Sequence, residues 1–83
     1  MNRRRLLRRL AGGALGNVAF ADLVNLVEGL GFRLERVSGS HHIFSHLELP
    51  ELINLQEVRG EAKSYQIRQL LRLVEKYALR LED

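Results

Sequence analysis

The chain contains no cysteine and only one proline, Pro50, in 83 residues. The absence of cysteine excludes a thiol nucleophile, a thiolate metal site and a disulfide. It also favours a reducing compartment, so we expect a cytoplasmic protein. No apolar run approaches the roughly 20 residues that cross a bilayer, so we expect no membrane partner.

The length of the chain sets an upper limit on its core. A single domain of this size buries only roughly 60–65% of the surface that its unfolded chain exposes. Hydrophobic residues make up 46% of the sequence, which argues against intrinsic disorder. We therefore expect one small globular domain.

Charge is distributed unevenly along the chain. No acidic residue precedes Asp22, and five arginines lie before it: Arg3, Arg4, Arg5, Arg8 and Arg9. From Asp22 onward the chain carries eight basic and ten acidic side chains. A basic N-terminal segment can contact phosphate groups or an acidic partner surface. A frayed, solvated terminus is an equally good interpretation, whereas a targeting presequence is disfavoured because serine is nearly absent.

The basic segment also has a weak helical pattern. Three leucines lie at helical spacing among the arginines: Leu6, Leu7 and Leu10. A helix this short is marginal in water unless it packs against something, and three glycines then interrupt it: Gly12, Gly13 and Gly16. We expect a basic N-terminal arm with a flexible connection at residues 1–16, and a folded body at residues 17–83.

Two segments of the body have the periodicity of helices with one buried face. In the first, the apolar stripe consists of Phe20, Leu23, Val24, Val27 and Leu30, and it predicts a helix over residues 21–30. Gly31 suits the position after a helix end, where a left-handed conformation is common. The second helix has Ser64 as its candidate N-cap and contains Ile67, Leu70, Leu71, Val74 and Tyr77.

Three segments between these helices predict strands: residues 32–37, 41–46 and 52–56. A turn signal, Ser38-Gly39-Ser40, joins the first two in a hairpin, and a loop with Pro50 precedes the third. The body is thus predicted to be an α+β fold of order α-β-β-β-α. In it a three-stranded antiparallel sheet carries two helices on one face. Double-stranded-RNA-binding domains have the same order of elements.

Alternation fails in the second strand, where Ile43 and Phe44 are adjacent apolar residues. They must face opposite sides of the sheet. His41 shares the side of Ile43, and His42 shares the side of Phe44. The sequence leaves open which side faces the core.

The histidines after the turn are the first candidates for catalysis. Histidine is the only side chain whose unperturbed pKa lies near neutrality, so it serves readily as a general acid or base. A polar residue bonded to backbone beside the turn is the alternative for His41. His42 and His46 share a face but lie about 13 Å apart along a strand, too far for one ion. We therefore expect neither a metal site nor a cofactor.

Together these features resemble the HicA family of toxins over residues 21–77. The resemblance rests on Gly31-Phe32 at the end of the first helix, on Gly39-Ser40-His41-His42 after the first strand, and on the apolar-aromatic pair behind them. It implies a fold similar to double-stranded-RNA-binding domains. It also implies an endoribonuclease of a type II toxin–antitoxin system that cleaves mRNA through one histidine without a required metal. A HicB antitoxin would neutralise it by covering the active site.

The resemblance assigns the catalytic role to His41, with His42 as the fallback and Gly39 and Ser40 as the supporting turn. The chain departs from the family pattern in three ways. The third strand lacks the second histidine and the proline near it, Leu47 and not proline follows His46, and the N-terminal arm is longer than usual.

Catalysis would also need cations for the phosphate charge, since RNA supplies its own nucleophile, the 2′-hydroxyl. The candidate RNA contacts are Arg36, Lys63 and Arg68. Two alternatives remain open: a non-catalytic RNA-binding module on this fold, and a protein-interaction module with the arginines docked on an acidic partner.

Overall fold

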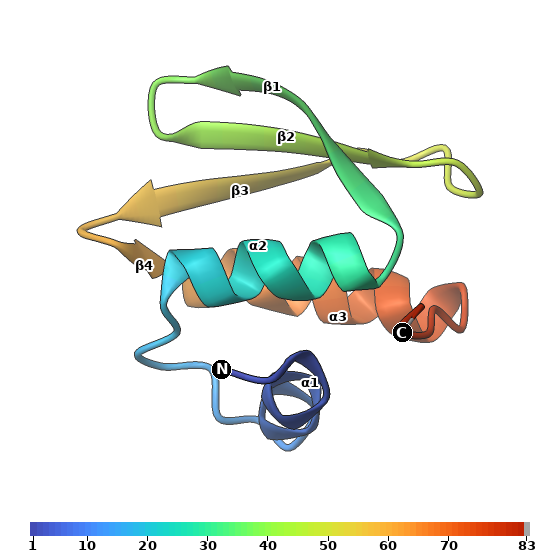
Figure 1. Cartoon of the computed structure of the whole chain (residues 1–83), viewed down its shortest axis with the longest axis horizontal. Helices are drawn as coiled ribbons and strands as arrows, with labels where there is room; N and C mark the ends of the chain where they lie inside the picture. Colours follow the sequence, from blue (N-terminus) through green and yellow to red (C-terminus); the bar gives the residue numbers. More distant parts are fainter. Residues whose placement is uncertain (83) are drawn as a thin grey trace.

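The structure is a computed structural model that describes residues 1–82, and its described part contains three helices and one antiparallel sheet. Figure 1 shows the sheet on one side of the molecule and the helices on the other. The elements in chain order are α1 (Arg3–Ala11), α2 (Phe20–Gly29), β1 (Phe32–Ser38), β2 (His41–His46), β3 (Ile53–Val58), β4 (Glu61–Ala62) and α3 (Ser64–Lys76).

The sheet has four strands in the order β1-β2-β3-β4, and each neighbouring pair is antiparallel. The prediction of a three-stranded sheet is therefore wrong by one strand. Arg59 and Gly60 both have positive φ, at 52° and 79°, and turn the chain back so that Glu61 and Ala62 pair with β3. A strand of two residues is too short to produce a pattern of alternation, which is why the sequence does not reveal β4.

The α+β class and the two body helices on one face of the sheet are confirmed (Figure 1). The core lies between α2, α3 and the sheet, where Phe44, Leu55 and Ile67 are all at most 1% exposed. The predicted helix at 21–30 and the predicted hairpin agree with α2, β1 and β2 to within one residue. The predicted likeness to double-stranded-RNA-binding domains stays a prediction.

The basic N-terminal segment forms a helix that packs on the body. Residues of α1 pack against α2 and α3 on their side away from the sheet, and Leu6 and Leu10 are 1% and 0% exposed (Figure 1). Asn2 caps this helix, with its Oδ1 accepting from the backbone N–H of Arg4 at 2.8 Å and of Arg5 at 3.1 Å. Burial of a leucine side chain stabilises a fold by about 1.5–3 kcal/mol, which offsets the poor intrinsic stability of so short a helix. The division of the chain into an arm at residues 1–16 and a body at residues 17–83 stays a prediction.

Two residues were predicted to lie at helix ends, Gly31 after the first body helix and Ser64 at the start of the second, and only the prediction for Gly31 is confirmed. Gly31 follows α2 with φ +99°, as its predicted role after a helix end requires. Ser64 is not the N-cap of α3, because Lys63 holds that position without a side-chain cap. The hydroxyl of Ser64 instead donates to the carbonyl oxygen of Leu15 at 3.5 Å.

Among residues 1–82, no helix combines the length and the apolar character that a bilayer crossing requires.

Candidate functional site

The candidate site begins at the turn between β1 and β2. Ser38 pairs with His41, so the hairpin loop consists of Gly39 and Ser40 alone. Gly39 has φ +60° and Ser40 is not among the residues with positive φ, which is the pattern of a type II′ turn. Because a two-residue loop fixes the register of the hairpin, the side chains of His41 and His42 point to defined and opposite faces of the sheet.

Burial decides which histidine faces the core. Phe44 is 0% exposed and pairs with buried Ile53, so its side of β2 is the side that the helices cover. His42 lies on that side, with its ring centroid 4.7 Å from that of Phe20 at the start of α2. His41 is exposed on the other side with Ile43. We call this uncovered side the open face; it includes Arg36, His41, Ile43 and Asn54.

On the open face, His41 contacts a side chain of β3. Its Nδ1 lies 3.2 Å from Oδ1 and 3.1 Å from Nδ2 of Asn54, whose backbone pairs with Ile43. The other ring nitrogen, Nε2, has no hydrogen-bond partner within residues 1–82. The imidazole is therefore held at one nitrogen and open to solvent at the other.

His42 is held by backbone instead. Its Nδ1 lies 3.2 Å from the carbonyl oxygen of Ser40, which also accepts from the backbone N–H of Glu57 at 3.0 Å. Because a carbonyl oxygen only accepts, a hydrogen bond at this contact requires the hydrogen on Nδ1, and in the neutral ring Nε2 then carries the lone pair. His42 is half-buried against Phe20, so an RNA chain would reach it less easily than His41.

A β-bulge brings two charged residues of β1 to the open face. The register of β1 against β2 shifts between Leu34 and Arg36, so Glu35 is the extra residue and Arg36 pairs with Ile43. Paired residues share a face of the sheet, which places Arg36 on the face of His41. No ion pair or hydrogen bond of the Arg36 side chain is described within residues 1–82.

Glu35 is occupied by other neighbours. The Ser45 hydroxyl donates to its Oε2, and Arg33 Nε lies 3.4 Å from the same oxygen. The hydrogen bond from Ser45, with a smaller contribution from Arg33, lowers the pKa of the Glu35 carboxyl. The carboxylate nearest to Arg36 in sequence is thus engaged by two other groups.

No contact of His41 with either of the other two predicted RNA contacts, Lys63 and Arg68, is described within residues 1–82. Lys63 is the N-cap of α3, with its Nζ 5.9 Å from the centroid of the Tyr65 ring. Gln66, two residues before Arg68, points to the sheet, because its Oε1 accepts from the backbone N–H of Gln56. Two residues on a helix span about 200°, so Arg68 points away from the sheet. The structure therefore brings Arg36 to the face of His41, but not Arg68.

Asn54 is the residue that sequence reasoning missed as a candidate. Its position in an alternating strand, between Ile53 and Leu55, indicated a polar side chain on the open face. Contact with His41 depends on the register of β3 against β2, which no local pattern reveals.

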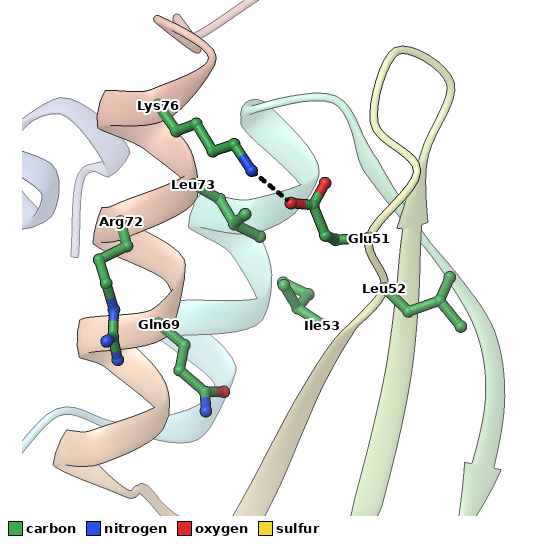
Figure 2. A pocket seen from close by; sticks show the side chains of 7 residues that line it. All are labelled: Glu51, Leu52, Ile53, Gln69, Arg72, Leu73 and Lys76. Atoms are coloured by element: carbon green, nitrogen blue, oxygen red, sulfur yellow. Dashed lines mark hydrogen bonds and ion pairs between the residues drawn. The ribbon is translucent and has the colours of Figure 1, made fainter.

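A groove elsewhere on the molecule does not contain these histidines. It has a volume of about 430 Å³ and lies between α3 and the start of β3, at the other end of the strand from Gln56, the partner of His41 (Figure 2). Lys76 Nζ bridges to Glu51 Oε2 at its rim at 3.1 Å, and the Tyr77 hydroxyl donates to Glu51 Oε1 at 2.6 Å. The hydrogen bond from Tyr77, followed by that from Lys76, lowers the pKa of Glu51. This carboxylate fastens the loop before β3 to the end of α3.

Within the described residues, no group of three or more His, Cys, Asp or Glu side chains is placed to hold a metal ion. His42 and His46 lie on the helix side of the sheet, and His41 lies on the open face.

Comparison with known families decides the class of the protein. The family model described as the HicA toxin of bacterial toxin–antitoxin systems matches residues 20–75, well over half of the chain. The chain belongs to the HicA toxin family. The resemblance inferred from the sequence is thus confirmed, and the protein is a toxin of a toxin–antitoxin system. No curated protein and no solved structure matches this HicA chain.

The family match includes the body of the protein and excludes the N-terminal helix. It begins at the first residue of α2 and ends within α3, so it includes the hairpin with His41 and His42. It leaves out α1 and its arginines. The basic helix therefore lies outside the matched residues.

Proposed function

We propose that this HicA toxin is an endoribonuclease that cleaves mRNA with His41 as its general base. The observation that carries the proposal is that an exposed imidazole, held at Nδ1, and the cation of Arg36 lie on the same uncovered face of the sheet. A general base must reach its proton, and Nε2 of His41 is open to solvent. The face around it is free of helices and admits an RNA backbone.

The chemistry uses the nucleophile that RNA carries. Nε2 takes the proton of a 2′-hydroxyl, whose oxygen then forms a bond to the adjacent phosphorus. The bond from phosphorus to the 5′-oxygen breaks, and that oxygen takes a proton from water. The products are a 2′,3′-cyclic phosphate and a 5′-hydroxyl end. Arg36 stabilises the charge that develops on the phosphate oxygens.

Lys63 is a second, more distant contact for the RNA backbone. It lies at the start of α3 beside the exposed ring of Tyr65. Double-stranded RNA is recognised mainly by shape and backbone, so a few cations without a sequence-reading motif are enough for binding. Arg68 has no part in this proposal, because it points away from the sheet.

Neutralisation follows from the same geometry. We propose that a HicB-like antitoxin silences the toxin by covering the open face at His41. A partner seated there would exclude RNA from both His41 and Arg36.

The test is cleavage of a defined RNA by the purified toxin and by His41→Ala and His42→Ala. Loss of a general base typically costs 10²- to 10⁴-fold in rate, and we expect a loss of about this size for His41→Ala only. Circular dichroism and thermal unfolding establish that each variant is folded. End analysis of the fragments should find 5′-hydroxyl groups.

The other outcomes assign other functions. Loss of cleavage in His42→Ala but not in His41→Ala would transfer the catalytic role to His42, whose Nε2 also carries a lone pair. Binding of RNA without cleavage would identify an RNA-binding module, and failure of both would favour a protein-interaction module.

A further inference from the structure

We propose that Asn54 is a positioning residue for His41: its side-chain oxygen accepts the hydrogen of Nδ1 and so leaves the lone pair on Nε2, facing the substrate. The inference rests on the proposed function. It adds to it the group that sets the tautomer and the ring direction of the base.

The contact between the two side chains admits two arrangements of the amide. Oδ1 and Nδ2 of Asn54 lie at nearly equal distances from Nδ1, 3.2 and 3.1 Å. If Oδ1 faces the ring, Nδ1 must carry the hydrogen, and Nε2 is the base. If Nδ2 faces the ring, Nδ1 accepts, and Nε2 carries the hydrogen. Only the first arrangement presents a base to the open face, so the two differ in an observable way.

Asn54 is held firmly enough to direct an imidazole. Its neighbours on β3, Ile53 and Leu55, are 4% and 1% exposed, so the backbone on both sides is anchored in the core. The backbone is also paired with Ile43 in the centre of the sheet. The asparagine side chain then has only two torsions, and a short side chain on a central strand limits the positions available to the ring.

The two polar residues paired opposite His41 are Ser38 on β1 and Gln56 on β3, and no hydrogen bond from either side chain to the ring is described within residues 1–82. Gln56 pairs with His41 across the strands, but its Nε2 donates to the Ser40 hydroxyl oxygen at 3.3 Å. This bond fastens Gln56 to the turn. Asn54 is the side chain that remains for Nδ1.

The charges around His41 make a substitution at Asn54 informative. From β1 the open face carries Arg36, and further along Arg33 and Glu35, which contact each other. From β3 it carries the uncharged side chains of Asn54 and Gln56, and from β2 those of Ile43 and Ser45. From β4, at the far edge of the sheet, the register places Glu61 on the same face. Asn54→Asp would add a negative charge in direct contact with the ring.

The experiment compares Asn54→Asp and Asn54→Leu with the wild type. The ring resonances of His41 are followed by NMR as a function of pH, and nitrogen shifts report the tautomer of the neutral ring. Cleavage of RNA is measured over the same pH range. Asn25→Asp is the matched control, because it makes the same change on α2, where Asn25 contacts Arg3 and not His41.

We expect a hydrogen on Nδ1 in the wild type. Asn54→Asp should move the His41 titration midpoint to higher pH by roughly half a unit to one unit, and the acid limb of the cleavage profile should move with it. Asn54→Leu removes the acceptor and should lower kcat by about 10- to 100-fold with little change in KM. Because an aspartate still accepts from Nδ1, Asn54→Asp should keep more activity than Asn54→Leu above the new midpoint. Asn25→Asp should shift neither curve.

Three results would overturn the inference: a hydrogen on Nε2 in the wild type, a midpoint unmoved by Asn54→Asp, or full activity in Asn54→Leu. Its failure can be distinguished from failure of the proposed function. If His41→Ala abolishes cleavage while the Asn54 variants behave as wild type, only the role of Asn54 falls. If the wild type cleaves no RNA, the proposed function is wrong, and the contact between Asn54 and His41 has no catalytic role, whatever the NMR titration shows.

Discussion

The open face of the sheet and the outer face of α1 lie on opposite sides of the helix pair α2 and α3 (Figure 1). The open face carries few charges but places them beside a histidine. The α1 face, which we define by exposed Arg5 and Arg8, carries a concentration of positive charge without any candidate base. The count of arginines alone would assign RNA binding to α1. The proposed function instead places the chemistry on the other side, with the histidine.

This comparison of the two faces shows that the basic segment contributes to the core, a role that its charge alone does not indicate. Leu6 and Leu10 belong to the core, and the arginines between and around them keep the outer side of α1 in water. Short helices gain most of their stability from such packing. The two faces can therefore be tested separately, by stability for α1 and by catalysis for the open face.

The largest expected effect is on stability. Leu10→Ala removes a side chain that is 0% exposed and should cost about 2–5 kcal/mol in the free energy of unfolding. In urea denaturation the midpoint should fall sharply. Leu7→Ala is the control, because Leu7 lies on the same helix and is only partly buried. Equal and small effects of both would mean that α1 is a detached arm after all.

The next effect concerns the two sets of arginines. Arg36→Gln should lower kcat/KM for a short RNA by about 10-fold, because one interaction with the developing phosphate charge is lost. Arg5→Gln and Arg8→Gln remove the same charge from the α1 face and should leave kcat/KM within about twofold of wild type. A larger loss from the α1 variants than from Arg36→Gln would reverse the assignment of the two faces.

A smaller effect should appear in the salt dependence of RNA binding. Each phosphate contact contributes about 0.7–0.9 to the slope of log affinity against log salt concentration. Arg36→Gln should lower this slope by about that amount, whereas Arg5→Gln combined with Arg8→Gln should leave it unchanged for an RNA too short to reach both faces. Deletion of residues 1–10 is not a suitable substitute, because it would also remove Leu6 and Leu10 from the core. A slope that falls only in the α1 variants would show that phosphate binds there.

The smallest effect concerns acid stability on the open face. The pKa of Glu35 is lowered in the fold from its ordinary value of 4.5, chiefly by the hydrogen bond from Ser45. A carboxyl whose pKa is lowered on folding stabilises the fold above its unfolded pKa and loses that contribution as pH falls through the folded value. Glu35→Gln should therefore be slightly less stable than wild type at pH 7, and the difference should disappear at strongly acidic pH.

Thermal unfolding across this range gives the measurement. Glu28→Gln on α2 is the control, since no ion pair of its carboxylate is described within residues 1–82. A difference for Glu35→Gln that stays constant with pH would show that the Ser45 contact does not depend on the charge.

Local patterns in the sequence predict much of this fold. The apolar stripes of α2 and α3 and the turn at Gly39 are complete within a few residues, so they can be read without knowledge of the rest of the chain. The packing of α1 depends on distant segments, and β4 has only two residues, too few for a pattern of alternation, so both were missed. The core-facing side of β2 was left open, because Ile43 and Phe44 are equally apolar and only the surrounding structure distinguishes them.

The candidate site was predicted less completely than the fold. The histidines follow a recognisable turn, and the family match includes them. Arg36 was named as a candidate, but the bulge at Glu35 that carries it to the open face has no signature in its own segment. The contact from Asn54 to His41 joins residues of two strands and exists only when the strands are in register.

The two-residue turn has a consequence for how this protein can change. On a pleated strand, the face that a residue occupies depends on whether its distance from the turn is odd or even. A shift of β2 by one residue would therefore turn over the whole strand: His42 would move to the open face, His41 to the core side, and Phe44, now 0% exposed, into solvent. Burial of this one phenylalanine thus keeps His41, and not His42, on the open face.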